Sequence, residues 1–545
     1  MVPALVSLCA RVVVSDHSSS PRWISCLPRE LYTPLLEAAV SDCRPLAVGE
    51  LVQRWPERTL QVGPGPRGRA WPDRLCIQAL LNGVTRGISN QSCALKILDL
   101  CGLQSPSKAQ IDRGDLMGGW SLTVAVCSMV IQASAGMKER KRFSALKREK
   151  DVKRERGRWQ MSINQDPGNA STDGSGFFGT DRIGLSGRLS QEDLVKGVRR
   201  RMEMERKRES TLADVAGSRR DNEETDPDRD VLMHVIVDLF ANSRSFGRIH
   251  IALTTLGPLK LHCRYLRVED LTMPKLRTLL SLLPHQSLLG FDIRYTSLGA
   301  AGFIELLPLL STFPALHSLQ LHYCNLDIRR DYFVEDDELR TMSQGLARLQ
   351  KLKRLSVTAL HMPGQLRAFL SSLPQPLETL EISSSRLRSE DFAYLSRSHH
   401  ASSLQQLDLS SNRLDNSILP SLRHLLYQAS SSLQDLCLCA CGLTDNGLGL
   451  LQPSLQCCRA LKSLALASNL LSMAGILDLV RTAVRMPSLR RLLYPMPVES
   501  SDEDLDCPLL ESTITIQLNR ILLDSGRSNM LLTSELDTFD ENILD

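Results

Sequence analysis

The sequence predicts an α/β solenoid, because nine segments in the C-terminal half of its 545 residues repeat one pattern, Leu-x-x-Leu-x-Leu-x-x-(Asn/Cys/Ser/Thr)-x-Leu. These copies begin at Leu256, Leu288, Leu316, Leu352, Leu377, Leu404, Leu433, Leu461 and Leu489. From Leu377 onward, successive starts are 27, 29, 28 and 28 residues apart, which leaves room for a strand, a turn and a full helix in each repeat. The pattern and the spacing together predict a leucine-rich-repeat horseshoe, with strands on its concave side and helices on its convex side.

Within one repeat, each group of residues has its own structural role. The Leu-x-Leu pair, such as Leu407 and Leu409, places two apolar side chains on the core side of a strand, while the residue between them faces out. The Asn position, such as Asn412, must satisfy the backbone of the turn, which Cys, Ser or Thr would do less completely. Apolar residues in segment 416–426 recur at helical spacing, so a helix should pack on the strands there. These features are typical of long, ribonuclease-inhibitor-like repeats.

Residues 1–104 are predicted to form an N-terminal helical cap and a first repeat-like strand. Two helices are expected between residues 22 and 62, because one segment opens with Pro28 in a first-turn position and another runs from Leu46 to Trp55 before a proline. The segment 95–100 carries leucines with the spacing of a repeat strand. It indicates a first rung that is separated in sequence from the others.

Residues 105–230 are predicted to be a basic, largely disordered insert or linker. From Met137 to Asp230 the apolar pattern collapses, and charged residues, Gly and Ser prevail. Residues 138–158 alone carry 11 Lys or Arg against 4 acids, and a second basic group ends at Arg208. The favoured interpretation is a solvated charged linker. The alternative is a nuclear-localisation or nucleic-acid patch, against which the lack of interleaved aromatic residues argues.

Composition disfavours several classes of protein. A net charge of +4 on a chain of this size gives no general attraction to nucleic acid or anionic membrane. The apolar N-terminus is interrupted by Arg11, and the apolar stretch Ser121–Ala135, about 15 residues, is too short to span a bilayer. Neither a secretory signal nor a membrane span is therefore expected, and the 15 cysteines should be reduced thiols in the cytoplasm or the nucleus.

No metal, cofactor or catalytic site is predicted. Cys437, Cys439 and Cys441 alternate along a strand and its turn, but no Cys-x-x-Cys spacing completes a tetrahedral metal site. His399 and His400 lie in a polar stretch without a ligand partner at metal spacing, which predicts a solvated pair. Because the chain also lacks a Gly-rich phosphate loop, a Gly-x-Ser-x-Gly elbow and a His-Glu-x-x-His motif, we expect a protein that is not an enzyme.

The outward residues of the predicted strands indicate a protein-binding surface on the concave side. Alignment of the repeats gives two outward columns that begin at Lys260 and His262 and grade through an acidic middle to an apolar end. The candidate partner-binding residues in these columns are His262, Arg294, His322, Glu381 and Asp408. The solenoid is expected over residues 231–498, and the C-terminal cap and acidic tail over residues 499–545. This tail, with apolar residues from Ile514 to Leu523, should cover the apolar end of the surface, which comprises Cys437, Cys439, Ala465, Ala467 and Leu493.

Several motifs resemble the PRAME-type leucine-rich-repeat proteins, in the same order along residues 22–104 and 231 to about 535. They are LPRELYTPLLEAAV followed by LVQRWP, then LKILDL, VIVDLF, LKLHCRYL, LETLEISSSRL, LQQLDLSSNRL and LLYPMPVES. The resemblance implies a cytoplasmic or nuclear binding protein without catalytic activity. It further implies a negative regulator of Toll-like-receptor and NF-κB signalling that binds the IκB kinase beta subunit. The alternatives are a substrate receptor of a cullin-2 and elongin B/C ubiquitin ligase, or a nuclear transcriptional coregulator; the N-terminal stretch Ser7–Val12 departs from the elongin-binding spacing.

Overall fold

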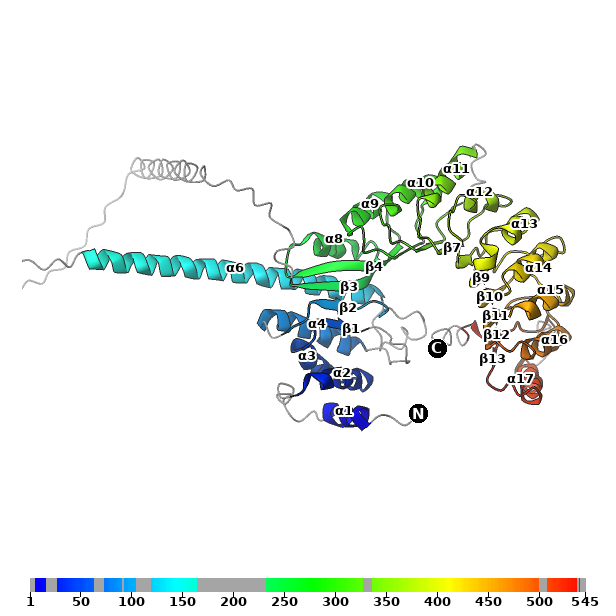
Figure 1. The fold of residues 1–545 in the computed structure, drawn as a ribbon, viewed down its shortest axis with the longest axis horizontal. Helices are drawn as coiled ribbons and strands as arrows, with labels where there is room; N and C mark the ends of the chain where they lie inside the picture. Colours follow the sequence, from blue (N-terminus) through cyan, green and yellow to red (C-terminus); the bar gives the residue numbers. More distant parts are fainter. Residues whose placement is uncertain are drawn as a thin grey trace, which may run out of the picture. The chain divides into compact units, whose positions relative to one another are not determined.

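The computed structural model describes residues 5–15, 27–62, 73–90, 93–103, 119–163, 232–326, 336–498, 507–536 and 539. The chain divides into two compact units, one formed by Met1–Met137 with Val231–Asp545 and the other by Lys138–Asp230. In the described part of the first unit, 13 strands form one parallel sheet whose order follows the chain from β1 to β13. Helices α8 to α16 all lie on one side of this sheet (Figure 1). The predicted α/β leucine-rich-repeat solenoid is confirmed.

The strands are β1 (Thr59–Gln61), β2 (Ile97–Asp99), β3 (Met233–Ala241), β4 (Leu259–Glu269), β5 (Gly290–Arg294), β6 (Ser318–His322), β7 (Arg354–Thr358), β8 (Thr379–Glu381), β9 (Gln406–Asp408), β10 (Asp435–Cys437), β11 (Ser463–Ala465), β12 (Arg491–Leu493) and β13 (Leu531–Thr533). The helices are α1 (Leu5–Ser15), η2 (Arg29–Leu31), α2 (Tyr32–Ser41), α3 (Pro45–Gln53), α4 (Arg74–Asn90), α6 (Gly119–Ile163), α8 (Phe246–Thr254), α9 (Met273–Leu282), α10 (Gly299–Leu310), α11 (Asp336–Ala347), α12 (Leu366–Leu370), α13 (Ser389–Arg397), η4 (Ala401–Ser403), α14 (Leu419–Gln428), α15 (Asp445–Cys457), α16 (Met473–Val484) and α17 (Cys507–Asp524).

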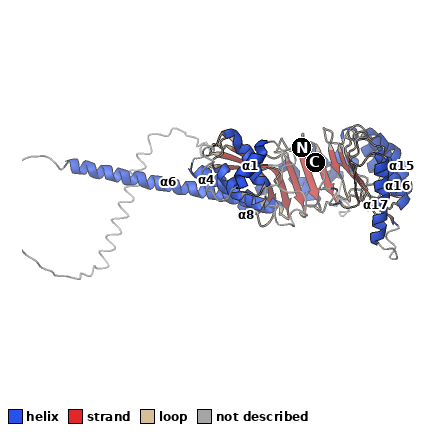
Figure 2. Cartoon of the chain, turned by 90° about the horizontal axis from the view of Figure 1, so that it is seen from below, coloured by secondary structure: helices blue, strands red, loops and turns tan. Residues whose placement is uncertain are grey.

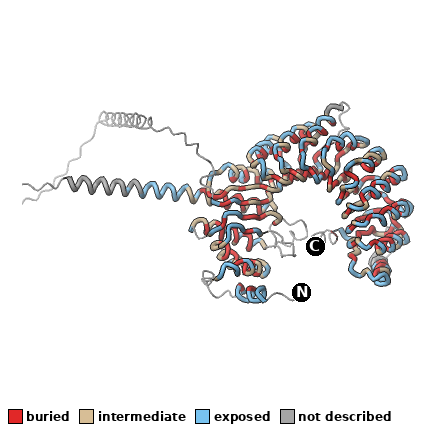
Figure 3. Tube along the Cα trace, viewed as in Figure 1, coloured by how far each residue is buried: buried red, intermediate tan, exposed pale blue. Residues whose placement is uncertain are grey.

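The leucines of the repeat pattern form the core. The nine predicted copies correspond to strands β4 to β12, which lie side by side in the sheet (Figure 2). Leu436 and Leu438, the two strand leucines of one copy, are 2% and 0% exposed, as the pattern predicted. One apolar cluster extends from Ala10 in α1 to Met530 before β13, and the buried residues follow the layer between strands and helices (Figure 3). Because each repeat contacts only its neighbours, this layer is built by repetition of one small interface.

In two repeats the turn after the strand is held by a buried asparagine side chain, that of Asn412 or Asn469. Asn412 is 0% exposed, and its Oδ1 accepts hydrogen bonds from the amides of Ser385 (3.2 Å) and Leu387 (3.1 Å) in the preceding repeat. Its Nδ2 donates to the carbonyls of Ile382 (2.7 Å) and Leu409 (2.9 Å). Asn412 therefore satisfies backbone groups of two successive repeats, which confirms the predicted role of this position.

Cysteine fills the same position less completely in another repeat. The Sγ of Cys441 donates to the carbonyls of Leu409 and Cys439, both at 3.4 Å. The amide of Cys441 is instead bound by Oδ1 of Asn469, in the following repeat, at 3.1 Å. A thiol donates only one weak hydrogen bond at a time and accepts poorly, so it cannot reproduce the two-sided bonding of Asn.

In several repeats a residue of the turn that follows the strand lies in the left-handed region of backbone space, even where it is not glycine. Examples are Tyr295 (φ 50°), Tyr323 (φ 54°), Ser411 (φ 57°) and Ser468 (φ 57°). This conformation is unfavourable for a residue with a Cβ atom. The turn's hydrogen bonds therefore impose it.

The N-terminal helices pack as predicted, but one strand of the cap was missed. The two expected helices are η2 with α2, and α3, which has Pro45 in its first turn. The lone strand expected at 95–100 is β2, and it is the second rung rather than the first, because β1 pairs with it on one side and β3 on the other. The strand β1 is only three residues long and contains one apolar residue, Leu60, so its sequence carries no repeat pattern.

Residues 119–137, which the sequence analysis assigned to the linker, belong instead to the core of the first unit. They form the first part of α6, and their apolar residues Leu122, Val126 and Val130 are each 0% exposed. The hydroxyl of Thr123 accepts a hydrogen bond from the amide of Phe240 in β3 at 2.8 Å. The stretch Gly119–Lys147 is long and apolar enough to cross a membrane, by length and composition alone. The apolar run Ser121–Ala135 that was recognised in the sequence is only part of this stretch. Its place is that of a repeat helix between β2 and β3.

The rest of the predicted linker belongs to the second unit. The described side chains from Lys138 to Lys147 are exposed, as a solvated charged segment requires. The remaining part of the basic segment, including the group that ends at Arg208, lies outside the residues whose side chains are described.

The C-terminal segment closes the sheet with one more rung. Helix α17 packs against α16 and buries Ile514, Leu518 and Leu522 in the main cluster, while Ile516 and Leu523 stay exposed. Strand β13 then pairs with β12 as the last strand. The expected terminal cap is therefore a further helix and strand, which continue the alternation of strands and helices along the chain.

His400 was expected to be solvated, and this expectation is wrong. Its side chain is 0% exposed, and its Nδ1 accepts a hydrogen bond from the amide of Leu377 at 3.2 Å. Burial, followed by the nearby His399, lowers the pKa of His400 to about 4. The neutral ring therefore serves the backbone at the end of one repeat, in a position that the polar character of the surrounding sequence did not reveal.

This histidine should make the repeats sensitive to mild acid. Its pKa in the unfolded chain is about 6.5, so the unfolded state binds the proton more tightly than the folded state does. Stability is therefore full above pH 6.5 and falls as the pH drops toward 4. We expect His400 to account for a loss of about 1–2 kcal/mol in the free energy of unfolding between pH 7 and pH 5.

Urea titrations of the wild-type chain and of His400→Gln at both pH values will measure this loss. The variant should lack that part of the acid sensitivity. The variant His285→Gln, at an exposed ring in another repeat, is the matched control and should behave as the wild type does. Equal acid sensitivity of wild type and His400→Gln would show that another group is responsible.

Candidate partner-binding face

The face of the sheet opposite helices α8 to α16, called here the free face, presents one outward row of side chains in the register of the strands. From β4 to β13 this row consists of Arg267, Asp292, Gln320, Ser356, Glu381, Asp408, Cys437, Ala465, Leu493 and Thr533. The next row begins with Glu269, Arg294, His322 and Thr358. The first predicted column is therefore correct from β5 to β12, and the second is correct from β5 to β7.

The predicted start of both columns is wrong. Strand β4 is 11 residues long, and a register shift opposite β3 separates its first half from the half that pairs with β5. Arg267 and Glu269 lie opposite Asp292 and Arg294, in the places given to Lys260 and His262. His262 instead lies nearer the start of the strand, where its Nε2 is 2.9 Å from Nδ1 of His234. Buried apolar residues alternate on both sides of a break at Arg264 and Tyr265, and the leucine pattern was aligned on the first half of the strand instead of the half that pairs with β5.

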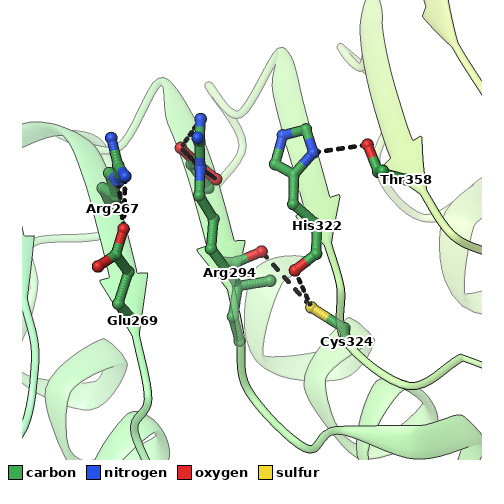
Figure 4. Close-up of polar contacts among 8 residues, drawn as sticks. Arg267, Glu269, Arg294, His322, Cys324 and Thr358 are labelled. Carbon is green, nitrogen blue, oxygen red and sulfur yellow. Dashed lines mark hydrogen bonds and ion pairs between the residues drawn. The ribbon is translucent and has the colours of Figure 1, made fainter. Parts of the chain in front are cut away.

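The first end of the free face is a set of internally paired charges (Figure 4). Arg267 forms an ion pair with Glu269, two residues along the same strand. Arg294 does the same with Asp292, with Nη2 2.9 Å from the carboxylate. Side chains two apart on a strand share a face, which explains both pairs. This end was expected to be basic, and the ion pairs make it electrically balanced.

His322 lies beside these pairs as a neutral ring. Its Nδ1 is 2.8 Å from the hydroxyl of Thr358 on the next strand (Figure 4). Burial, followed by the charge of Arg294, lowers its pKa. His322 and Arg294, both predicted site residues, are therefore brought together on adjacent strands.

Two exposed aromatic residues at this end were not among the predicted site residues. The rings of Tyr295 and Tyr323 stack with 5.4 Å between their centroids and 3° between their planes. They are 59% and 51% exposed. They occupy the left-handed position directly after Arg294 and His322, and that position alone could have marked them. Exposed aromatic side chains beside arginine are the residue types that most often anchor protein interfaces.

The middle of the free face carries the other two predicted residues. Glu381 and Asp408 lie opposite each other on β8 and β9. Burial, together with the charge of Asp408, raises the pKa of Glu381. Asp408 accepts a hydrogen bond from the amide of Ser410 at 2.8 Å. Strands β6 and β7 separate this pair from Arg294, so the five predicted residues form two separate groups and one outlier, His262.

The apolar end of the free face is covered, as expected, by the C-terminal tail. The cover is Phe539, which is 5% exposed and forms a cluster with the buried Ala465 and Leu493. Cys437, Cys439 and Ala467 pack against this cluster. We call these five residues the apolar socket. The expected cover was the stretch from Ile514 to Leu523, which lies in α17 in the main core, so this part of the prediction is wrong.

Several buried cysteines of the described ranges are poorly suited to nucleophilic chemistry. Burial raises the pKa of Cys441 and of Cys458 to about 12, and that of Cys324 to about 11. A thiol with such a pKa is a poor nucleophile at neutral pH. Within the described ranges, no group of three or more His, Cys, Asp or Glu is placed to hold a metal ion. The described part of the free face thus carries polar side chains at its first end and in its middle, and the apolar socket at its other end.

Comparison with known proteins agrees with this description. The model of the PRAME C-terminal domain matches residues 235–537. The chain is similar to leucine-rich repeat-containing protein 14 of Xenopus laevis, with 30% identity over 98% of this chain and 97% of that protein. It is 37% identical to the protein of the same name from Homo sapiens, over 56% of this chain and 64% of that one.

Among solved structures, the chain is similar to the leucine-rich repeat-containing protein LegL7 from Legionella pneumophila, at 15% identity and a TM-score of 0.27, over 54% of this chain and 82% of that chain. The matched PRAME domain covers more than half of the 545 residues. The chain therefore belongs to the PRAME family of leucine-rich-repeat proteins.

Proposed function

We propose that this protein is a non-catalytic adaptor that binds the IκB kinase beta subunit on its free face in the cytoplasm and so restrains Toll-like-receptor and NF-κB signalling. The observation that carries the binding role is the free face itself, which presents an ordered row of polar side chains, with a pair of exposed tyrosines at the adjacent strand ends. The identity of the partner rests on the resemblance of the sequence to relatives with that role.

The physical case for a protein partner comes from the first end of the face. The ion pairs of Arg267 and Arg294 are rigid, because each is formed within one strand. A partner can therefore add hydrogen bonds to them without first ordering flexible side chains. Tyr295 and Tyr323 add a large, rigid apolar surface beside these charges.

The test is co-purification of the IκB kinase beta subunit with the tagged full-length chain from cells. Tyr323→Ala and Arg294→Ala should each reduce the amount recovered at least about tenfold, the loss typical of an interface anchor. The matched controls are Tyr427→Ala and Arg423→Ala, two exposed residues of α14 on the opposite side of the sheet. Recovery that is unchanged in the Tyr323 and Arg294 variants would exclude this end of the face as the binding surface.

A second candidate function is that of a ubiquitin-ligase substrate receptor, and helix α1 favours it. The helix buries only Ala10 and Val14, and its ion pair from Arg11 to Asp42 fixes it on α2. Its other apolar residues, Leu5, Val6, Leu8, Val12 and Val13, are 40–75% exposed. An exposed apolar helix face is suited to insertion into a partner's groove.

Co-purification also distinguishes this candidate. If α1 recruits elongin B/C, elongins and cullin-2 will be recovered with the wild-type chain and lost with the double variant Leu8→Ser and Val12→Ser. Val14→Ala, on the buried side of α1, tests whether the helix must be docked on α2. Absence of elongins from the wild-type sample would exclude the ligase role.

A further inference from the structure

The contact between Phe539 and the apolar socket differs from the contacts of α17 and β13, the other described parts of the C-terminal segment. Helix α17 and strand β13 join the main core, whereas Phe539, Ala465 and Leu493 form a separate cluster on the opposite side of the sheet. The described contacts that hold Phe539 are this cluster, a cation–π contact with Arg491, and a hydrogen bond from its amide to the carbonyl of Glu535 at 3.2 Å. One aromatic side chain thus bears most of the attachment.

The socket is built to hold an aromatic ring. The guanidinium of Arg491 lies 5.4 Å from the centroid of the Phe539 ring. Arg491 is itself held by Asp435, with its Nη2 3.5 Å from the carboxylate, and only 14% of its side chain is exposed. A fixed cation over an aromatic ring and small residues beneath it form a selective pocket for one ring.

A hollow beside the Phe539 ring is lined by acidic residues and therefore favours a positively charged occupant. A cavity of about 330 Å³ is bounded by Phe539 and Leu536 on the tail side and by the carboxylates of Glu381, Asp408 and Asp435 on the strand side. The raised pKa of Glu381 is the sign of a carboxylate in a setting that disfavours its charge. In the sequence, however, Phe539 is flanked by Asp537, Asp540 and Glu541. A sequence with acidic neighbours on both sides of the aromatic residue carries the wrong charge for an acidic hollow.

We propose that the apolar socket and the acidic hollow form a docking site for a partner segment with an aromatic residue next to Lys or Arg, and that Phe539 is its displaceable internal competitor. This inference rests on the proposed role of the free face in protein binding, and adds to it a second subsite and its regulation. The tail supplies an aromatic ring to the socket, but it supplies no positive charge to the acidic hollow. A segment that supplies both displaces it, so the tail limits access to the middle of the free face.

The test uses the full-length chain and a fluorescein-labelled synthetic peptide with Lys-Phe-Lys at its centre, measured by fluorescence anisotropy. The variant Phe539→Ala should bind this peptide about tenfold or more tightly than the wild type, because the competitor has been removed. Ile516→Ala, an exposed apolar residue of α17, is the matched control and should bind as the wild type does. Peptides with Glu-Phe-Glu or Lys-Ala-Lys at the centre should bind to Phe539→Ala at least about tenfold more weakly than the Lys-Phe-Lys peptide does.

Two further measurements keep the inference open to refutation. Filling the socket with Ala465→Leu in the Phe539→Ala background should abolish peptide binding, while thermal unfolding shows that the repeats remain folded. Alkylation of Cys437 and Cys439, followed by mass spectrometry, should be faster in Phe539→Ala than in the wild type, with the exposed Cys457 as internal reference. Equal peptide affinity, or equal alkylation, in wild type and Phe539→Ala would overturn the competitor role of Phe539.

The outcomes also separate this inference from the proposed function. Peptide binding to the open socket, without recovery of the IκB kinase from cells, would refute the proposed partner and leave the docking site standing. Recovery of the kinase that depends on Tyr323 but is identical in wild type and Phe539→Ala would keep the partner and refute the socket as its subsite.

Discussion

Replacement of Leu436 by Asp should destroy the cooperative folding of the central repeats. Leu436 is 2% exposed between Leu407 and Leu464, which lie opposite it on the adjacent strands β9 and β11. Loss of the leucine leaves a cavity that costs about 2–5 kcal/mol. The carboxylate must then be buried without a partner or be protonated, which adds several kcal/mol. The sum approaches the whole stability of a typical domain, about 5–15 kcal/mol.

The damage should begin locally, because a solenoid is stabilised by contacts between neighbouring repeats. Hydrogen exchange should therefore show loss of protection first in β9 to β11, and urea unfolding should lose its single transition. The matched control is Leu450→Asp, the same substitution at a leucine of α15 that is 47% exposed. It should change the free energy of unfolding by less than about 1 kcal/mol. A Leu436→Asp protein with wild-type protection would mean that the assigned core register is wrong.

The regularity of the leucine repeat explains both the correct and the incorrect predictions of strands. Leucines at fixed spacing determine which side of each strand is buried, and this periodicity predicted β5 to β12 with the correct outward residues. The pattern carries information only where a repeat is regular. Strand β4, with its register shift, and β1, with its single inward leucine, depart from regularity, and there the alignment failed.

Residues 119–137 show a second reason why part of the fold could not be predicted from the sequence. Their apolar run was recognised, but the strands that flank this helix are β2 and β3, which are separated in sequence by more than 130 residues. A helix of the repeat can only be recognised when its strand lies close by in the sequence. The insertion of residues 138–230 after this helix separated it from β3 and concealed its role.

The sequence predicted which residues line the candidate site, but not which of those residues contact one another. Outward residues follow from strand alternation, so Arg294, His322, Glu381 and Asp408 were found. Which of them pair, and with what, depends on side-chain conformations, so the internal ion pairs of Arg267 and Arg294 were not foreseen. Phe539 was missed because a single aromatic residue in an acidic tail has no periodicity. Its contact with Leu493 joins residues 46 positions apart in the chain.

The free face therefore combines two kinds of surface that a partner would meet differently. Near Arg294 the polar groups already satisfy one another, so binding there should depend on shape and on the stacked tyrosines rather than on net charge. Near Glu381 the carboxylates lie beside a socket whose occupant can leave. A long partner that contacts both ends would be anchored at the first and regulated at the second.

Replacement of Asn412 by Ala should have the second largest effect on stability. The side chain forms hydrogen bonds with the amides of Ser385 and Leu387 and with the carbonyls of Ile382 and Leu409, and all of this lies in the buried turn layer. Alanine leaves these backbone groups without partners, and each buried hydrogen bond of this kind is worth about 1 kcal/mol. We expect the free energy of unfolding to fall by about 3–4 kcal/mol.

Two companion variants determine whether hydrogen bonding is the cause of that loss. Asn412→Cys places at this position the residue that Cys441 provides in the next repeat; its thiol retains a weak donor but loses the acceptor for Ser385 and Leu387. It should therefore be intermediate between wild type and Asn412→Ala. Asn446→Ala, at an exposed position of α15, should stay within about 0.5 kcal/mol of the wild type. Urea unfolding of all three variants provides the measurement. Equal losses in Asn412→Ala and Asn412→Cys would contradict this order and would show that a thiol donor contributes nothing measurable to the turn.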